Sequence, residues 1–198
     1  MLSTVTVNTI LIFILLTSCK KPETTKVNQT PKEEKSKSTE PQFLAVSRND
    51  KNLLKAYQQA RQTLSTFIDM TTDKKNEAAT NAVKVKVYDI EHSKEMGEDC
   101  FVYLWFYDIY KVDDTYMGQL YELPKGGIND MKIYTYINFT EDLIHDWLII
   151  KNGNLWGGYT LRVIRKSKPN LEEKQKYDKY IGITKYEPLQ GMENSYLE

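Results

Sequence analysis

The sequence predicts an α+β fold, in which an N-terminal helix packs on a curved, mostly antiparallel β-sheet or partial barrel and a short helix lies near the C-terminus. Three observations predict it: a helical repeat of apolar residues over 53–68, later segments in which apolar and polar residues alternate, and an Asn-Gly turn between two apolar runs. Because the strands follow one another through short connections, we expect most neighbouring strands to be antiparallel.

The N-terminal helix is predicted from apolar residues that recur three and four positions apart, as on one helical face. These residues are Leu53, Tyr57, Ala60, Leu64 and Phe67, with Leu54 and Ile68 beside them. Ser47, Asn49 or Asp50 could cap the start, because their side chains accept hydrogen bonds from the first backbone N–H groups. The pattern ends at residues 71–73.

Four strands are predicted after this helix. The alternation of Val with polar residues over 83–87 is typical of a half-buried strand. The nearly continuous apolar and aromatic run 101–110 predicts a central strand that is covered on both faces. Two further strands are predicted at 116–123, which ends before Pro124, and at 131–137, where apolar residues alternate again.

A β-hairpin is the clearest local prediction. Asn152-Gly153 separates the apolar run 147–151 from the segment 154–156. Asn-Gly is favoured in a type I′ turn, because both central residues of that turn need a positive φ. The sequence therefore predicts two antiparallel strands joined by a two-residue loop.

The return strand of this hairpin is expected to be long and irregular. Gly157 and Gly158 predict a bulge or bend, after which the strand should continue over 159–164. Pro169 then introduces residues 170–180, which we expect to form a short surface helix. No internal repeat is present in the sequence.

The N-terminus has the features of a lipoprotein signal peptide. Residues 10–16 are an uncharged apolar run that is too short to span a bilayer, and the sequence continues as Leu16-Thr17-Ser18-Cys19. This tetrapeptide resembles the bacterial lipobox, which implies removal of residues 1–18 and lipidation of Cys19. An ordinary signal peptide or a short anchor helix is the alternative. Two or three acyl chains on one cysteine give stable membrane anchoring.

Composition divides the rest of the chain into a tether and one domain. Residues 19–46 begin with the lipidated cysteine and continue as a polar segment, which predicts a disordered tether. Residues 47–198 suit a single α+β domain. With Cys19 lipidated, Cys100 has no partner for an internal disulfide, and it is expected to be a buried apolar residue. Basic and acidic residues balance at 27 each, which does not favour nucleic acid as a partner.

Three segments carry a resemblance to a known family: Ile144-His145-Asp146-Trp147, the Asn152-Gly153 turn, and Gly157-Gly158-Tyr159-Thr160-Leu161-Arg162. They resemble the signature of the YegJ-like domains of unknown function (domain of unknown function 2314). The resemblance covers about residues 50–166 and implies the fold and the domain limits, but no activity. The sequence departs from the family pattern at Asp99, Cys100 and Phe101, where a His and a Trp are expected, and at Glu122, where an Asn is usual.

The candidate binding or structural motif consists of Asp146, Trp147, Gly157, Gly158, Tyr159 and Arg162. The turn should place Asp146 opposite residues 158–160, and a glycine bulge could bring it toward Arg162. In a binding patch, Arg162 would hold an anion and Trp147 would be a stacking wall. In a structural role, an Asp146–Arg162 pair would fix the hairpin over a buried Trp147. The structural role is favoured.

No catalytic set and no metal site is predicted, and no cofactor is expected. The two histidines, His92 and His145, are not spaced as metal ligands. His145 and Asp146 are neighbours on a strand and should point to opposite faces, so they cannot form a catalytic pair. The strand tyrosines could instead form an exposed row for a carbohydrate or protein, or pack across strands. They are Tyr103, Tyr107, Tyr121, Tyr134 and Tyr136.

These observations favour a non-catalytic binding module for a protein or glycan, held on the non-cytoplasmic side of the inner or outer membrane of a bacterial envelope. A protective protein of the immunity type is one version. One alternative is an envelope hydrolase, which would need Asp146 or Glu122 beside a second carboxylate or His145. The other is a structural envelope component, which would present an extended apolar patch.

Overall fold

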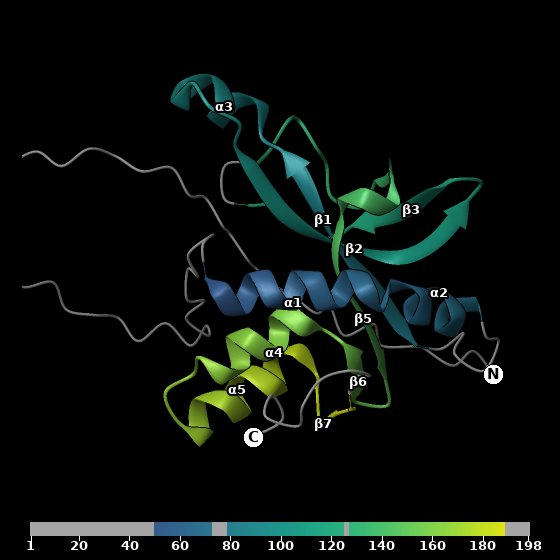
Figure 1. The fold of residues 1–198 in the computed structure, drawn as a ribbon, viewed down its shortest axis with the longest axis vertical. Coiled ribbons are helices and arrows are strands. Elements are labelled where there is room, and N and C mark those ends of the chain that lie inside the picture. Colours follow the sequence, from purple (N-terminus) through teal and green to yellow (C-terminus); the bar gives the residue numbers. More distant parts are fainter. Residues whose placement is uncertain (1–49, 73–78, 125–126, 189–198) are drawn as a thin grey trace, which may run out of the picture.

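The computed structural model of the chain describes residues 50–72, 79–124 and 127–188. These residues form helices and one open seven-stranded sheet, which confirms the α+β prediction; the sheet does not close into a partial barrel (Figure 1). The predicted signal peptide, Cys19 and the tether lie outside the described residues.

The predicted N-terminal helix is present as two consecutive segments, α1 (Lys51–Gln62) and α2 (Leu64–Thr72). Asp50 caps α1, because its carboxylate accepts the N–H groups of Asn52 at 2.7 Å and Leu53 at 3.1 Å. Thr63 interrupts the helix, and its hydroxyl donates back to the Gln59 carbonyl at 3.0 Å. Four residues of the predicted apolar face are buried, namely Leu53, Ala60, Leu64 and Phe67, together with Ala56. Tyr57 and Ile68 are partly buried, and Leu54 is exposed.

The sheet has the strand order β4-β3-β2-β1-β5-β6-β7, and all neighbours are antiparallel except β6 and β7. The strands are β1 (Thr80–Tyr88), β2 (Phe101–Val112), β3 (Thr115–Leu120), β4 (Tyr136–Phe139), β5 (Ile144–Lys151), β6 (Asn154–Gly157) and β7 (Lys185–Tyr186). The hairpin β5–β6 turns at Asn152 and Gly153, which have φ values of 52° and 77°, so this prediction is confirmed.

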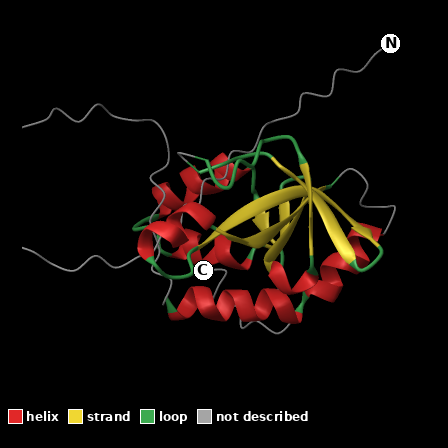
Figure 2. Ribbon diagram, turned by 90° about the horizontal axis from the view of Figure 1, so that it is seen from above, coloured by secondary structure: helices red, strands yellow, loops and turns green. Residues whose placement is uncertain are grey.

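Two apolar clusters lie on opposite faces of the sheet. Val83 pairs with Phe106 and Trp147, and this row belongs to the cluster that includes the apolar residues of α1 and α2. Ala82, on the other face, pairs with Tyr107 and Leu148, in the cluster that includes α4 (Tyr159–Lys166) and α5 (Leu171–Ile181). Helices therefore lie on both faces of the β1–β5–β6 part of the sheet (Figure 2).

Two short helical elements were not predicted, and neither was the two-residue strand β7. Helix α3 (Ile90–Met96) connects β1 with β2 and projects away from α1, α4 and α5 (Figure 1). It is capped by Asp89, which accepts the N–H of His92 at 3.0 Å, and it ends at Gly97. The other is a single 3₁₀ turn, η2 (Glu141–Leu143), before β5. Segments of this length give too few repeats for a helical period to be recognised.

The predicted strand at 131–137 is wrong for most of its length, because only β4 (Tyr136–Phe139) is extended and paired. Asn129, Asp130 and Tyr134 all have φ values between 50° and 63°, so the chain turns repeatedly before β4. The N–H of Tyr134 donates to the Leu120 carbonyl at 2.6 Å, which holds this turn against the end of β3.

The predicted continuation of the return strand over 159–164 is also wrong, because these residues form α4. Gly157 and Gly158 do not make a bulge within a strand. Both have a left-handed backbone, with φ values of 68° and 63°, and they end β6 and begin α4. The helix at 170–180 is confirmed as α5, capped by Asn170, whose side chain accepts the N–H of Glu173 at 3.0 Å.

Replacing Gly157 by alanine tests how strictly this corner is built. A Cβ there would collide with the carbonyl and the ring of Trp147, and the left-handed backbone adds strain. We expect Gly157→Ala to lower the free energy of unfolding by about 3 kcal/mol, measured by urea denaturation. Gly182→Ala is the matched control, since its φ is also positive but its Cβ would meet no atom within 4 Å. It should cost only about 1 kcal/mol; equal losses would contradict the packing argument.

Candidate functional site

Asp146 lies at the centre of a buried polar network. Its side chain is fully buried and accepts hydrogen bonds from the backbone N–H groups of Trp147 at 2.8 Å, Tyr159 at 3.1 Å and Thr160 at 2.7 Å. The Thr160 hydroxyl donates a fourth bond at 2.6 Å. Because Gly158 has no side chain to cap α4, the Asp146 carboxylate takes that place at the positive end of the helix dipole. Asp146 thus contacts residues 159 and 160, which the hairpin was expected to place near it, but through the start of a helix and not through strand pairing.

Lys84 completes this network from the neighbouring strand β1. It is opposite Asp146 in the β1–β5 pairing, and its ammonium group donates to the Thr160 hydroxyl at 2.8 Å. The ammonium also lies 5.1 Å from the centroid of the Trp105 ring. Burial lowers the pKa of Lys84 to about 8, although the charge of Asp146 opposes this shift. Burial likewise raises the pKa of Asp146, against the charge of Lys84 and the hydrogen bonds from Thr160 and Trp147.

Trp147 is buried against α1 and presents no ring face to solvent. Its indole N–H donates to the Ala60 carbonyl and to the Thr63 hydroxyl, both at 3.1 Å. Tyr159 reaches the same place from α4, since its hydroxyl is 2.6 Å from that of Thr63. These contacts fix α1 on β5 and α4, so Trp147 and Tyr159 have a structural role.

Arg162 does not pair with Asp146, and the expected Asp146–Arg162 pair is wrong. The buried guanidinium donates to three backbone carbonyls, those of Gly157 at 2.8 Å, Leu155 at 3.2 Å and Glu187 at 2.8 Å. Burial lowers its pKa to about 10. The reason is local: residues 159–166 form a helix and not a strand, so Arg162 points back to the end of β6 and to the segment after β7.

His145 is the extra residue at an irregularity of the β1–β5 pairing, between Ile144 opposite Val85 and Asp146 opposite Lys84, and it lies in an aromatic cluster. Its ring is in edge contact with Tyr57 at 5.3 Å and with Tyr103 at 5.1 Å, between ring centroids, and these two tyrosines stack on each other. Burial, followed by the charge of Lys86, lowers the pKa of His145 to about 4. The imidazole is therefore neutral at pH 7 and packed among aromatic rings.

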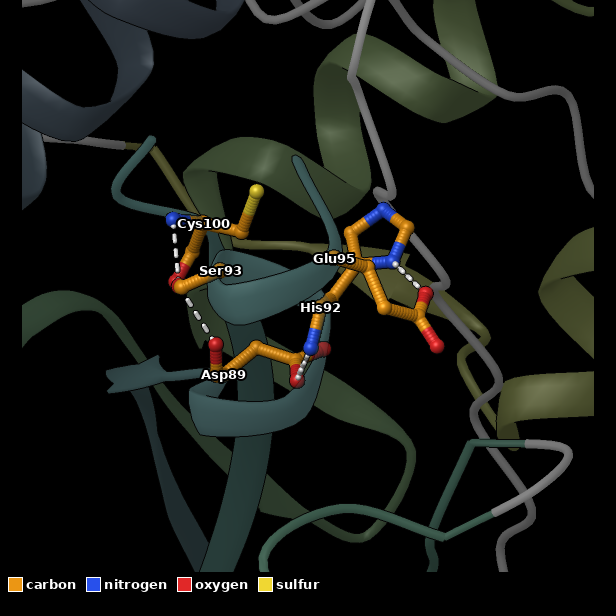
Figure 3. Close-up of polar contacts among 5 residues, drawn as sticks. All are labelled: Asp89, His92, Ser93, Glu95 and Cys100. Atoms are coloured by element: carbon orange, nitrogen blue, oxygen red, sulfur yellow. Dashed lines mark hydrogen bonds and ion pairs between the residues drawn. The ribbon is translucent and has the colours of Figure 1, made fainter. Parts of the chain in front are cut away.

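Cys100 is buried, as predicted, at the junction of α3 and β2. Figure 3 shows Ser93 between Asp89 and Cys100, where the Ser93 hydroxyl accepts the Cys100 N–H at 2.8 Å and donates to the Asp89 carbonyl at 2.5 Å. His92 points away from this group and pairs with Glu95 at 3.5 Å. Ser93 and Asp89 thus fix the end of α3 to the start of β2.

Five tyrosines form a surface on the β2–β3–β4 part of the sheet, here called the tyrosine face: Tyr107, Tyr110, Tyr121, Tyr134 and Tyr136. Tyr107 belongs to the core cluster that includes α4 and α5. The ring of Tyr121 contacts that of Tyr107, with 5.1 Å between centroids, and that of Tyr134, with 5.7 Å. Tyr110 and Tyr136 contact each other at 5.8 Å. Three rings are well exposed, Tyr110 and Tyr136 at 46% and Tyr134 at 59%.

Both alternatives for the strand tyrosines are present: Tyr134 and Tyr136 are exposed, whereas Tyr107 is buried and packs against the partly buried Tyr121. Tyr103 does not join them, because it stacks with Tyr57 beside His145. Tyr110 was missed; a shift of register between Tyr107 and Tyr110 places it opposite Met117, on the same face as Tyr107 and its partner Gln119. Nothing in the alternation of residues 101–110 indicates that irregularity.

Polar side chains lie among these rings. Gln119 is opposite both Tyr107 and Tyr136, and Asn138 is opposite Met117, so the two rows share one face. Asp108 lies in the irregular part of β2 with a φ of 52°, and its carboxylate accepts the hydroxyl of Tyr121 at 2.9 Å. Burial, then this bond, raises the pKa of Tyr121 to about 12. The surface therefore combines aromatic rings with fixed polar groups.

Within residues 50–72, 79–124 and 127–188, no group of three or more His, Cys, Asp and Glu side chains is arranged to hold a metal ion. Over the same residues, no helix is long and apolar enough to cross a membrane.

Asp146→Ala tests the structural role of the buried network. The change leaves the Lys84 charge buried without its counter-charge and the start of α4 uncapped, so we expect a loss of about 3–5 kcal/mol in the free energy of unfolding. Asp142→Ala is the control, because Asp142 is exposed and its hydrogen bond to Arg61 uses the backbone carbonyl. Urea denaturation should give a loss below about 0.5 kcal/mol for this control. A stable Asp146→Ala protein would contradict the assignment.

Comparison with known proteins gives one match to a family. No curated protein and no solved structure matches the chain. A family model described as "Uncharacterized protein conserved in bacteria (DUF2314)" matches residues 50–184, from the cap of α1 to the residue before β7. This match covers more than half of the chain, and the chain therefore belongs to that bacterial family of uncharacterized proteins.

Proposed function

We propose that the protein is a lipid-anchored protein of the bacterial envelope whose domain binds a glycan through the tyrosine face. Two observations support the proposal: the lipobox-like Leu16-Thr17-Ser18-Cys19, and the exposed tyrosines with polar groups between them. The family match adds a bacterial origin and no activity.

The observation that carries the proposal is the group of Tyr110, Gln119 and Tyr136 on three neighbouring strands, in which two exposed rings in contact share one face with an amide. A sugar ring presents C–H groups on its faces and hydroxyl groups around its edge. Tyrosine rings can pack against the C–H faces, and an amide can form hydrogen bonds with the hydroxyl groups. In a protein interface, by contrast, polar groups lie mainly at the rim around an apolar centre. The interleaved arrangement here therefore favours a glycan over a protein partner.

The tyrosine face is also held in place before any ligand binds. Tyr107 is part of the core cluster, and Tyr121 is packed between Tyr107 and Tyr134 while its hydroxyl is bound to Asp108. Tyr134 is exposed although its backbone is left-handed, a conformation that is unfavourable for a bulky residue. Fixed rings lose little conformational freedom on binding, which favours affinity.

The contacts of Asp146 do not support the alternative of an envelope hydrolase that uses this residue. All four of its hydrogen bonds come from the protein's own N–H and O–H groups, and the carboxylate is fully buried. A structural envelope component would present an extended apolar patch, whereas polar groups, the Gln119 amide and the Asp108 carboxylate, lie among the rings of the tyrosine face.

Replacing Cys19 tests the anchor. Cys19→Ala should abolish incorporation of a labelled fatty acid and move the protein from the membrane fraction to the soluble fraction, since lipid is the proposed attachment. Cys100→Ala is the matched control, because these are the two cysteines of the chain and Cys100 is buried in the domain. Labelled Cys19→Ala protein would show that the lipobox assignment is wrong.

Replacing exposed tyrosines tests the binding surface. We expect the detergent-solubilised protein to co-sediment with insoluble polysaccharides (isolated peptidoglycan, cellulose and chitin). Tyr136→Ala and Tyr110→Ala should each weaken this binding roughly tenfold, as expected for the loss of a stacking ring worth about 1.4 kcal/mol.

Tyr88→Ala is the matched control for these variants. Tyr88 has a similar exposure, 42%, but lies at the end of β1 near α3. Its replacement should leave binding unchanged. Equal loss in all three variants, or binding that survives Tyr136→Ala and Tyr110→Ala, would show that the tyrosine face is not the glycan site. If no polysaccharide binds while cross-linking in cells captures a protein at Tyr136, the glycan proposal is replaced by a protein partner.

A further inference from the structure

We infer that the glycan bound at the tyrosine face is neutral or carries amino groups, and is not one rich in carboxylate or phosphate. This inference rests on the proposed function and adds the chemical class of the ligand. It follows from the hydrogen-bonding direction and charge of the groups that the structure fixes between the rings.

The first of these groups is the Asp108 carboxylate. It is exposed on β2, and its Oδ2 accepts the Tyr121 hydroxyl at 2.9 Å, which fixes its position at the tyrosine face. A carboxylate has only acceptors to offer, so a ligand that binds beside it must donate. Sugar hydroxyl and ammonium groups donate; ligand carboxylates and phosphates do not.

The second group is the Gln119 amide. Its Nε2 donates to the backbone carbonyl of Tyr134 at 3.1 Å, which uses the donor end of the amide on the turn before β4. The acceptor end, Oε1, is then the part of this amide that remains for a ligand between Tyr107 and Tyr136. Gln119 and Asp108 therefore both favour a ligand that donates hydrogen bonds.

Two carboxylates act on rings of the tyrosine face. The negative charge of Glu122 contributes, after burial, to raising the pKa of Tyr107, and that of Asp108 acts on Tyr121 in the same way. Lys111 pairs with Tyr116, which is buried in the cluster of α1 and α2, and its ammonium lies 5.9 Å from that ring, on the other face of the sheet. An anionic polymer would meet the exposed Asp108 carboxylate at the tyrosine face, and the negative charge of the partly buried Glu122 would add to the repulsion at low salt.

The test compares three soluble probes by titration calorimetry at low ionic strength with the lipidated protein in detergent: cello-oligosaccharides (neutral), chitosan oligosaccharides (amino-bearing) and oligo-uronates (anionic). We expect the first two to bind and the third to bind at least tenfold more weakly. Asp108→Asn should lower the affinity for the amino-bearing probe several-fold. The difference in affinity between the amino-bearing and the anionic probe should become smaller. Asparagine retains the shape and tolerates the left-handed backbone at this position, so the variant should fold.

Lys94→Ala is the control, since Lys94 is exposed in α3, outside the tyrosine face. It should leave all three affinities unchanged. If the oligo-uronate binds as tightly as the other probes and Tyr136→Ala abolishes that binding, the inferred charge class is wrong while the glycan-binding function stands. If none of the probes binds and the insoluble polysaccharides also fail to bind, both the inference and the proposed function are wrong.

Discussion

The arrangement of the domain depends on the hydrogen bonds that the buried carboxylate of Asp146 accepts. One side chain satisfies the first backbone N–H groups of α4, a hydroxyl on that helix and a backbone N–H of its own strand. Through Thr160 it is linked to Lys84 in β1, so two strands and a helix meet at one point. Burying such charges is costly unless they are paired and hydrogen-bonded. The same geometry then directs α4 toward α1, where Tyr159 and Trp147 both reach Thr63.

Much of the fold could be predicted from the sequence because it is determined by local patterns. The helical spacing from Leu53 to Phe67, the alternation over 83–87 and the Asn152-Gly153 turn all act within a few residues. The segment Tyr159–Ile164 could not be predicted in this way. Its β-branched and aromatic residues favour a strand, and the group that caps it as a helix is Asp146, which is 13 residues from Tyr159 along the chain. Tertiary contact thus overrode local propensity.

The candidate motif was predicted in its location and not in its pairing. Asp146 does contact residues 159 and 160, but a helix in place of a strand turns Arg162 toward the carbonyls of Leu155, Gly157 and Glu187. The tyrosine face also depends on features that local sequence patterns do not indicate. The irregularity at Asp108 brings Tyr110 onto it, and the left-handed Tyr134 comes from a turn where an alternating pattern suggested a strand.

The division of the sheet into two halves connects the buried network with the exposed surface. Around β1, β5 and β6, helices on both faces and the Asp146–Thr160–Lys84 network make a closed scaffold. Tyr107 belongs to the same cluster as Leu161 of α4 and Tyr177 of α5, and from it the ring contacts continue to Tyr121 and Tyr134. The scaffold therefore fixes the rings that contact it before any ligand binds. A ligand of the proposed kind would then lose less free energy to the ordering of these side chains.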